Sequence, residues 1–439
     1  MSTAVQPSAN LPASGAAPSS ALARAKNLPM FASLSNKDFR TLWTSMLFFF
    51  TAMQMSFVAQ GLLTFELAGT ATAIGLVGLA WGITQLPASL IAGVAADRLP
   101  KRSLILFSQS TMAVTALITG ILAQTGVIQV WHIFVLALFN GAVFSFTVPA
   151  RQAWIPELVG EGQLMNAVAL NSAAFTFTGI LGPALAAVLI AVPKVDLAEI
   201  YFLMAGCYVV VVFMVMRIPG GQPMAGRETR HPLHELTDGF RYVRRHAVLP
   251  YVLLMGFVPI VIAMPYRTFF PVFQERVYHV DKDWVGVMGA VMAAGALVGA
   301  LGVASLSNTS RRSTIQMFGG LAFGVGLIFL GAAQTLPLGL VALLFVGFAS
   351  NGYWALNNTM VLSVTRPEYY GRVMSVYMIS WAVSPFAAFP ESALADLFGV
   401  QWLVAGLGVT LIVALLAIAV LLPGQRRMDQ PHVETSAAG

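Results

Sequence analysis

Charge is scarce in this sequence: Lys, Arg, Asp and Glu make up only 10% of its 439 residues, whereas 57% are hydrophobic and the mean hydropathy is +0.78. Soluble globular domains carry roughly a quarter charged residues, so this composition excludes an ordinary soluble protein and indicates a membrane protein surrounded by a lipid bilayer. Cysteine is almost absent as well. The single residue, Cys207, excludes a disulfide within the chain.

Sequence motifs of enzymes are also missing. The chain has no Gly-rich nucleotide loop ending in Lys-Ser or Lys-Thr, no Gly-x-Ser-x-Gly elbow and no Cys or His cluster at metal-ligand spacing. We therefore expect no enzyme activity, no cofactor and no metal. The formal charge of +6 comes from basic residues scattered between apolar runs, which predicts no nucleic-acid partner.

What the sequence does contain is a series of long runs without charged residues. A helix needs roughly 20 apolar residues to cross a bilayer, and dividing the runs by that length predicts twelve spans in an all-α integral membrane protein. The runs with one span each are Thr41–Phe65, Leu67–Ala96, Leu164–Pro193, Ile200–Met216, Ala247–Tyr266, Trp284–Ser310, Val373–Pro390 and Leu397–Gln425. Two longer runs, Leu104–Ala150 and Ser313–Thr365, hold two spans each.

The basic residues predict the orientation of these spans. An even number of spans places both termini on one side, and Lys and Arg concentrate on the cytoplasmic side of a membrane. All but four of the 24 Lys and Arg residues fall in the N-terminal segment, in every second loop or in the C-terminal tail. The exceptions are Lys194, Arg267, Arg276 and Lys282. Both termini are therefore expected in the cytoplasm.

The polar segments predict a division into five parts. A cytoplasmic linker splits the spans six and six, and the stretch His234–Arg245 within it is expected to form a short amphipathic helix at the membrane surface. The parts are a disordered cytoplasmic tail (1–35), an N-terminal six-helix bundle (36–216), the linker (217–246), a C-terminal six-helix bundle (247–425) and a cytoplasmic tail (426–439).

The two bundles carry sequence echoes at a similar offset. Gly93-Val94-Ala95 with Lys101-Arg102-Ser103 reappears about 209 residues later as Gly302-Val303-Ala304 with Arg311-Arg312-Ser313, and Phe139-Asn140-Gly141 matches Phe345-Val346-Gly347 at an offset of about 206. Two parallel six-helix repeats are typical of transporters that alternate access between the two faces of a membrane.

Twelve spans, this repeat and the stretch Gly93-x-x-x-Asp97-Arg98-x-x-Lys101-Arg102 after span 2 resemble the major facilitator superfamily, although Pro100 replaces a usual Gly. Further stretches are similar to the branch of enterobactin-type siderophore exporters and macrolide efflux proteins. These are Pro149–Ala153, Ile155–Val159, Asn166-Ala167, Leu170–Ser172, Gly182–Ala186 and Gly371–Ser375.

The resemblance implies a secondary active transporter of the bacterial inner membrane. Its implied activity is export of a small-molecule substrate, drug- or siderophore-like, in exchange for protons, by a monomer. An importer or lysolipid translocase on the same fold, or a membrane sensor that transports nothing, are the alternatives.

The resemblance also assigns a gate. In the family, the acid matching Asp97 meets the start of span 11, here about Tyr370–Val373, when the transporter closes to the cytoplasm. A simpler role, anchoring a loop in the cytoplasm, accounts for the basic residues alone. The gating set comprises Gly93, Asp97, Arg98, Lys101, Arg102, Gly371 and Arg372.

In span 5, Gly179-x-x-Gly182-Pro183 resembles the antiporter motif of drug exporters, in which glycines allow close helix packing and the proline bends the helix. The copy is degraded, because Thr178 stands where the family has its first Gly. The family's arginine inside span 4 is missing, since the stretch 134–147 holds no charge. If the protein couples transport to protons, other residues must carry them.

Ionisable groups at membrane depth are costly, so each is a candidate site. Glu66, Arg267, Glu391 and Asp396 qualify, and the expected depths of Arg267 and Glu391 allow an ion pair. That pair could line the substrate path or be structural, or the two groups could fail to meet. The softer candidates for the path, which could equally bond neighbouring helices, are Gln54, Gln85, Asn140, Asn171, Trp354 and Asn357.

Overall fold

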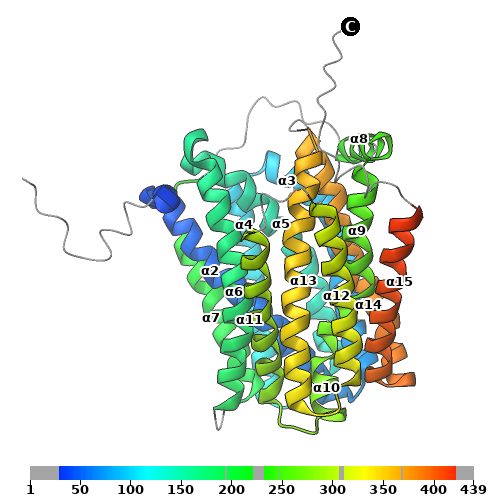
Figure 1. Cartoon of the computed structure of the whole chain (residues 1–439). Helices are drawn as coiled ribbons and strands as arrows, with labels where there is room; N and C mark the ends of the chain where they lie inside the picture. Colours follow the sequence, from blue (N-terminus) through cyan, green and yellow to red (C-terminus); the bar gives the residue numbers. More distant parts are fainter. Residues whose placement is uncertain are drawn as a thin grey trace, which may run out of the picture.

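The computed structural model describes residues 29–192, 195–220, 232–246, 248–305, 311–366 and 369–421. Throughout this part of the chain the regular secondary structure is helical, and twelve helices are long and apolar enough to cross a membrane (Figure 1). The predicted all-α fold with twelve spans is confirmed.

Most spans follow one another with short connections, and the long exception is the segment that contains α8, between spans 6 and 7. Span 7 differs from the rest, because its α-helix gives way to a 3₁₀ turn before resuming. The first six spans are α2 (Lys37–Ala68), α3 (Ala71–Arg98), α4 (Lys101–Gln124), α5 (Val130–Val159), α6 (Leu164–Ala191) and α7 (Leu197–Met216). Span 7 comprises α9 (Leu249–Ile262), η3 (Met264–Phe269) and α10 (Phe270–Arg276). The last five are α11 (Asp283–Ser305), α12 (Arg312–Ala332), α13 (Leu336–Val364), α14 (Tyr370–Phe398) and α15 (Val400–Leu421).

The remaining elements lie at one end of the bundle. The short helices η1 (Pro29–Ser35) and η2 (Glu161–Gln163) flank the N-terminal half, and α8 (Pro232–Arg245) lies across the ends of the spans. Figure 1 shows α8 at the top and α10 at the bottom. We call the end with α8 the termini face, because α2 begins there and α15 ends there, and the opposite end the far face.

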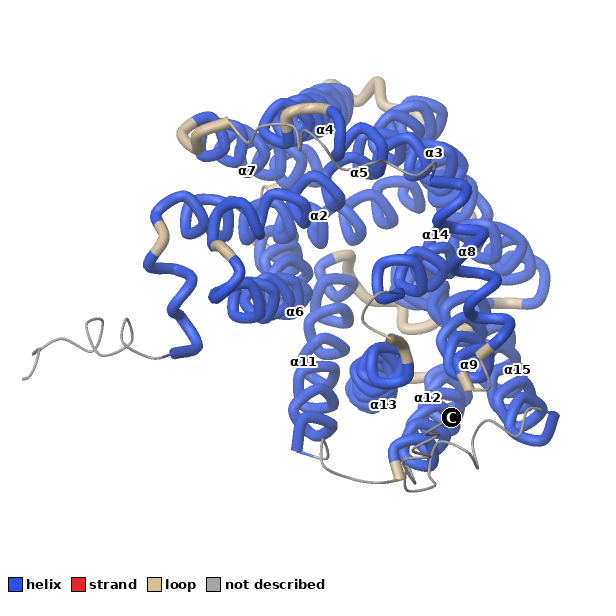
Figure 2. The backbone as a smooth tube through the Cα atoms, turned by 90° about the horizontal axis from the view of Figure 1, so that it is seen from above, coloured by secondary structure: helices blue, strands red, loops and turns tan. Residues whose placement is uncertain are grey.

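Helix packing repeats between the two halves. In the N-terminal half α3 packs on α5 and α4 packs on α7, and in the C-terminal half α11 packs on α13 and α12 packs on α15 (Figure 2). The matched glycines of the sequence repeat have matching contacts. A Cβ at Gly141 would overlap the carbonyl oxygen of Trp81 on α3, and one at Gly347 would overlap that of Met292 on α11. Both glycines therefore permit the closest helix pair of their half.

Substitution of Gly141 by alanine is expected to destabilise the protein by about 1–3 kcal/mol, because the added Cβ must push the α3 backbone away. Gly78→Ala is the matched control, since a Cβ at Gly78 meets nothing within 4 Å and alanine favours a helix. Thermal unfolding of the two variants in detergent checks this. A midpoint for Gly141→Ala at or above that of the control would contradict it.

The last residues of the segment predicted as a disordered tail, Pro29–Ser35, form the 3₁₀ helix η1. Buried Ser33 donates its hydroxyl to the side-chain oxygen of Asn166 on α6, and its N–H donates to the same oxygen at 3.1 Å. Asn36 then caps α2 by accepting from the N–H groups of Asp38 and Phe39. Residues 1–28 and the predicted tail 426–439 lie outside the described residues.

The two halves meet along two seams that lie towards the far face. In the first, Gly75 and Gly82 of α3 pack on Ser392 and Pro385 of α14. In the second, residues of α6 pack on α11, with Pro183 against Gly289 and Ala187 against Gly286. Each pair of helices is antiparallel, so the contacts follow one register along each seam.

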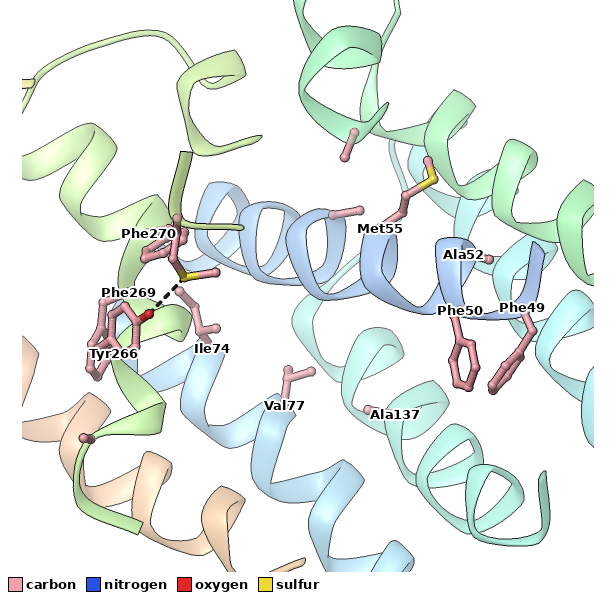
Figure 3. Packing of buried hydrophobic residues seen from close by; sticks show 14 of the residues in the cluster. Phe49, Phe50, Ala52, Met55, Ile74, Val77, Ala137, Tyr266, Phe269 and Phe270 are labelled. Carbon is pink, nitrogen blue, oxygen red and sulfur yellow. Dashed lines mark hydrogen bonds between the residues drawn. The ribbon is translucent and has the colours of Figure 1, made fainter. Parts of the chain in front are cut away.

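Buried aromatic side chains of span 7 pack near the first seam, beside α3 (Figure 3). Figure 3 shows Tyr266, Phe269 and Phe270 of span 7 beside Ile74 of α3, and Met55 and Phe49 farther along α2. Tyr266 and Phe269 are fully buried, and Tyr266 stacks edge-on against Phe270. The break in span 7 brings these aromatic groups to the joint between the halves.

Candidate functional site

Ion pairs and charged hydrogen bonds join the two halves at the far face. Asp396, near the end of α14, accepts hydrogen bonds from the N–H groups of Ala71 and Thr72 and from the Thr72 hydroxyl, at 2.7–3.0 Å. Arg276 of α10 forms an ion pair with Asp396 at 2.9 Å and also donates to the carbonyl oxygen of Gly69. A carboxylate at a helix N-terminus is favourable, so the first turn of α3 holds Asp396 firmly.

A second, looser set of charges lies beside it. Lys282, which precedes α11, lies 3.8 Å from a carboxylate oxygen of Glu66 and 3.6 Å from one of Asp196. Lys282 and Glu66 are exposed, and exposed pairs at these distances contribute little energy. The structure thus places Glu66 in the closure of the far face, at the end of α2.

Glu391 of α14 lies beside the first seam: its neighbour Ser392 packs on Gly75, and Glu391 lies about a quarter turn round the helix from that face. One of its carboxylate oxygens is buried and has no hydrogen-bond partner among the described residues. Arg267 lies on η3 with an exposed side chain, and the described residues give it no ion pair. The expected depths of Arg267 and Glu391 assumed that span 7 runs past Arg267 as a continuous helix, whereas its α-helix gives way to the 3₁₀ turn η3 before Arg267.

Towards the termini face, side chains that face the other half become exposed. Phe57 lies one helical turn from Gly61, which approaches Pro271 across the joint, and it is 57% exposed. Trp381 lies one turn from Pro385 and is 40% exposed. Both side chains therefore lie uncovered on the termini side of the seams.

Two residues predicted to line the substrate path, Gln85 and Trp354, lie at the level of Trp381 in the bundle. The register of the first seam places Gln85 of α3 opposite α14 near Trp381, and the side-chain oxygen of Gln85 is buried without a hydrogen-bond partner. Trp354 of α13 packs on Trp381 with ring centroids 5.6 Å apart, and its indole N–H has no partner among the described residues. Both polar atoms are therefore buried with a hydrogen-bonding capacity that no described residue uses.

The remaining predicted amides differ in their partners. Asn140 accepts from the Thr115 hydroxyl at 2.8 Å, and Asn357 donates to the carbonyl oxygen of Val252 at 3.0 Å. Gln54 packs on Gly182 of α6, close to Gly179, so these glycines bring α6 against α2. Those three side chains therefore form hydrogen bonds or packing contacts with helices of their own half. The side-chain oxygen of Asn171 is buried and has no partner among the described residues.

Two residues of the loop motif after span 2 stabilise the N-terminal half. The Lys101 ammonium is fully buried and forms an ion pair at 2.7 Å with Glu157 at the end of α5. Arg102 donates to the carbonyl oxygen of Met216 and so satisfies the C-terminus of α7. Arg98 is exposed. Lys101 is thus a packed residue, where we expected a loop anchor or a gate.

The rest of the predicted gate is only partly visible. Gly93, Asp97 and Gly371 lie on helices α3 and α14, but their side-chain surroundings fall outside the described part of the chain. The Arg372 guanidinium lies over the ring of Tyr369 at 5.1 Å. The proposed latch between Asp97 and the start of α14 stays a prediction.

A family model described as Major Facilitator Superfamily matches residues 42–389. The chain belongs to the Major Facilitator Superfamily. It is therefore a membrane transporter of small molecules and not an enzyme.

Curated relatives within the superfamily are exporters. The multidrug efflux pump Tap of Mycolicibacterium fortuitum is 27% identical over 387 residues, covering 85% of this chain and 93% of the pump. The enterobactin exporter EntS of Shigella boydii is 24% identical over 307 residues, covering 69% of this chain and 72% of the exporter.

Solved structures share the fold at lower identity. The nucleoside transporter NupG superposes with a TM-score of 0.66 at 13% identity, covering 87% of this chain and 98% of NupG. A bacterial homologue of the human lysosomal transporter Spinster, in an inward-facing and unoccupied conformation, has a TM-score of 0.65 at 12% identity, covering 91% of this chain and 97% of that protein. The major facilitator fold is thereby established.

One buried charge of this major facilitator protein escaped prediction. Arg151 was assigned to the loop after span 4, but α5 continues through Pro149 to Val159 and places Arg151 inside the bundle, 2% exposed. Its guanidinium donates to the Ser45 hydroxyl at 3.1 Å and lies 4.9 Å from the centre of the Phe49 ring. Its other two nitrogens have no partner among the described residues.

The signal for Arg151 was present in the sequence. It lies in the stretch Pro149–Ala153 that is similar to the exporter branch, but the charge-free rule ended span 4 at Ala150. A proline near the end of a span does not terminate the helix when neighbouring helices support it. Span 4 therefore carries an arginine after all, nearer the termini face than the uncharged stretch 134–147.

Loss of the Lys101 ammonium is expected to destabilise the N-terminal half, because it leaves the Glu157 carboxylate without its partner. Removal of one member of a buried pair costs about 3–5 kcal/mol, and partly exposed Glu157 should bring the cost to the low end of that range. Thermal unfolding of Lys101→Met measures it. The double variant Lys101→Met with Glu157→Leu should recover most of the loss, and a purely additive double variant would contradict the pairing.

Proposed function

We propose that this protein exports small organic molecules from the cytoplasm by proton antiport with alternating access. The observation that carries the proposal is the placement of the contacts between the halves, which lie in two seams and a charged cluster towards one face. Such an arrangement can open at one end only when it closes at the other. The multidrug efflux and enterobactin export named for two relatives support the direction and the substrate class.

The concentration of Lys and Arg favours the termini face as the cytoplasmic one. On that assignment, the closed far face keeps the substrate level sealed from the outside and accessible from the cytoplasm, which is the loading state of an exporter. Gln85, Trp354 and Trp381 are the groups we assign to the substrate. A single chain supplies both sides of each seam, so a monomer suffices for the cycle.

We assign the proton to Glu391. It is the predicted carboxyl group of α14 with a buried oxygen that has no hydrogen bond among the described residues. We propose that the movement of α14 when the far face opens exposes this carboxyl group to the outside, where it takes up a proton. Asp97 and Arg372 are proposed to latch the termini face in the opposite state, as the family resemblance implies.

Export and coupling are tested together in proteoliposomes that contain the pH dye pyranine. Compounds from four classes, namely siderophores, macrolides, cationic dyes and lysolipids, are first screened for growth protection of cells that produce the protein. The active compound should then move across the liposome membrane against its gradient while protons move the other way. Proton movement in the same direction as the compound would indicate an importer, and no flux for any class would indicate a sensor.

A further inference from the structure

The helix α8 connects the two halves at the termini face. It contacts α14 and α9 of the C-terminal half and the end of α3 of the N-terminal half. Tyr242 stacks on Tyr369 at the start of α14, with ring centroids 4.1 Å apart and planes 8° apart, and its hydroxyl accepts from the N–H of Arg366 at 3.3 Å. The helix is therefore held in a defined orientation.

His246, just after α8, holds the start of α9. Its Nδ1 accepts hydrogen bonds from the N–H groups of Val248 and Leu249 at 3.3 and 3.2 Å. Burial and the nearby Arg366 guanidinium lower the pKa of His246, so the imidazole remains neutral and Nδ1 can accept. The inward stripe of α8 thus ends in a cap for the next span.

The opposite stripe of α8 is basic and aromatic. Phe240 is 48% exposed and Arg241 is 67% exposed, and Arg244 and Arg245 are exposed beside them. Asp238 lies 3.8 Å from Arg241, and Arg244 and Arg245 have no ion pair among the described residues. Tyr242 and Val243 point the other way and are half-buried. One face of the helix therefore packs on the protein, and its outer face carries three arginines and one phenylalanine.

This combination fits a lipid headgroup layer. Guanidinium groups bind phosphate oxygens through paired hydrogen bonds, and a phenylalanine between them gains free energy at the boundary of the acyl chains. The leaflet on the cytoplasmic side, to which the basic residues assign the termini face, is rich in anionic lipids. A free phosphate ion would leave Phe240 exposed to water.

We infer that the outer face of α8, formed by Phe240, Arg241, Arg244 and Arg245, is a binding site for anionic phospholipid headgroups. The same helix holds the starts of α14 and α9 through Tyr242 and His246. Lipid bound to α8 would therefore hold the first turns of α14 and α9 at the membrane surface. The site is separate from the substrate level, so its test does not depend on the proposed transport activity.

The test uses the full-length protein in detergent, titrated with phosphatidylglycerol or phosphatidylcholine and followed by native mass spectrometry. The triple variant Arg241→Gln, Arg244→Gln, Arg245→Gln should lose phosphatidylglycerol affinity by about tenfold or more, because each arginine near an anionic surface adds to binding. The matched control, Lys37→Gln, Arg40→Gln, Arg217→Gln, removes three exposed basic residues elsewhere and should keep the affinity.

Further variants distinguish the binding of a lipid from the binding of a soluble phosphate or of RNA. The variant with Arg241→Lys, Arg244→Lys and Arg245→Lys keeps the positive charge and should retain most phosphatidylglycerol binding. The thermal unfolding midpoint of each variant checks that the fold persists. Phe240→Ser should weaken binding of phosphatidylglycerol but not of soluble glycerol phosphate. Equal loss in both triple variants, equal binding of the two lipids by the wild type, or equal affinity for glycerol phosphate and the lipid would each overturn the inference. If added RNA does not displace bound phosphatidylglycerol, the result supports a lipid site. If the protein binds RNA in preference to phosphatidylglycerol, the inference is overturned.

Discussion

Glu391→Gln is expected to abolish proton-driven export while the protein reaches the membrane in normal amounts. Glutamine keeps the shape of the side chain but cannot exchange a proton. The carboxyl group of Glu391 is partly buried, with one oxygen that has no hydrogen bond among the described residues, so the amide breaks no interaction seen there. The fold should therefore persist and the coupling should be lost.

The measurement separates transport from coupling. Export against a gradient, driven by an inward proton gradient in proteoliposomes, should fall to the level of empty liposomes, whereas exchange of labelled for unlabelled substrate without a gradient should continue. Glu391→Asp is the matched variant, since it keeps a titratable group and should retain part of the activity. Export by Glu391→Gln at the wild-type rate would assign the proton to another residue.

The second large effect is expected from the charged cluster at the far face. Asp396→Asn combined with Arg276→Gln removes the ion pair and weakens the bonds that Asp396 accepts from α3. Hydrogen bonds to charged groups contribute about 1.5–3 kcal/mol each, and each 1.4 kcal/mol is a factor of ten in a conformational equilibrium. The double variant should therefore shift the protein markedly towards a state open at the far face.

A single cysteine reports this opening. In a Cys207→Ser background, Phe57→Cys places a thiol on the termini side of the joint between Gly61 and Pro271. A membrane-impermeant maleimide supplied at the far face should label it slowly in the parent and rapidly in the double variant. Glu199→Gln is the control, because Glu199 caps its own helix α7 and the described residues place it in no contact between the halves. Unchanged labelling would show that the cluster does not hold the far face closed.

The spans, the family and the absence of enzyme chemistry could be read from the sequence, because each depends on local composition. A bilayer excludes charge from every span independently, so charge-free runs marked the helices without any knowledge of their neighbours. The same rule failed where neighbouring helices supply partners. It ended span 4 before Arg151 and span 7 before Arg276, although α5 and α10 continue beyond these limits.

The pairing of charges was decided by the tertiary structure. Sequence spacing allowed Arg267 to meet Glu391, but the break in span 7 leaves Arg267 exposed, and the described partner of Asp396 is Arg276, 120 residues away. Lys101 read as a loop anchor because nothing local distinguishes it from Arg98, yet α5 brings Glu157 to it and buries it. By itself, then, the sequence determined where the chain crosses the membrane and which fold it takes. Which end is closed, and which charges close it, were decided by contacts between distant helices, because one sequence must serve both ends of an alternating cycle.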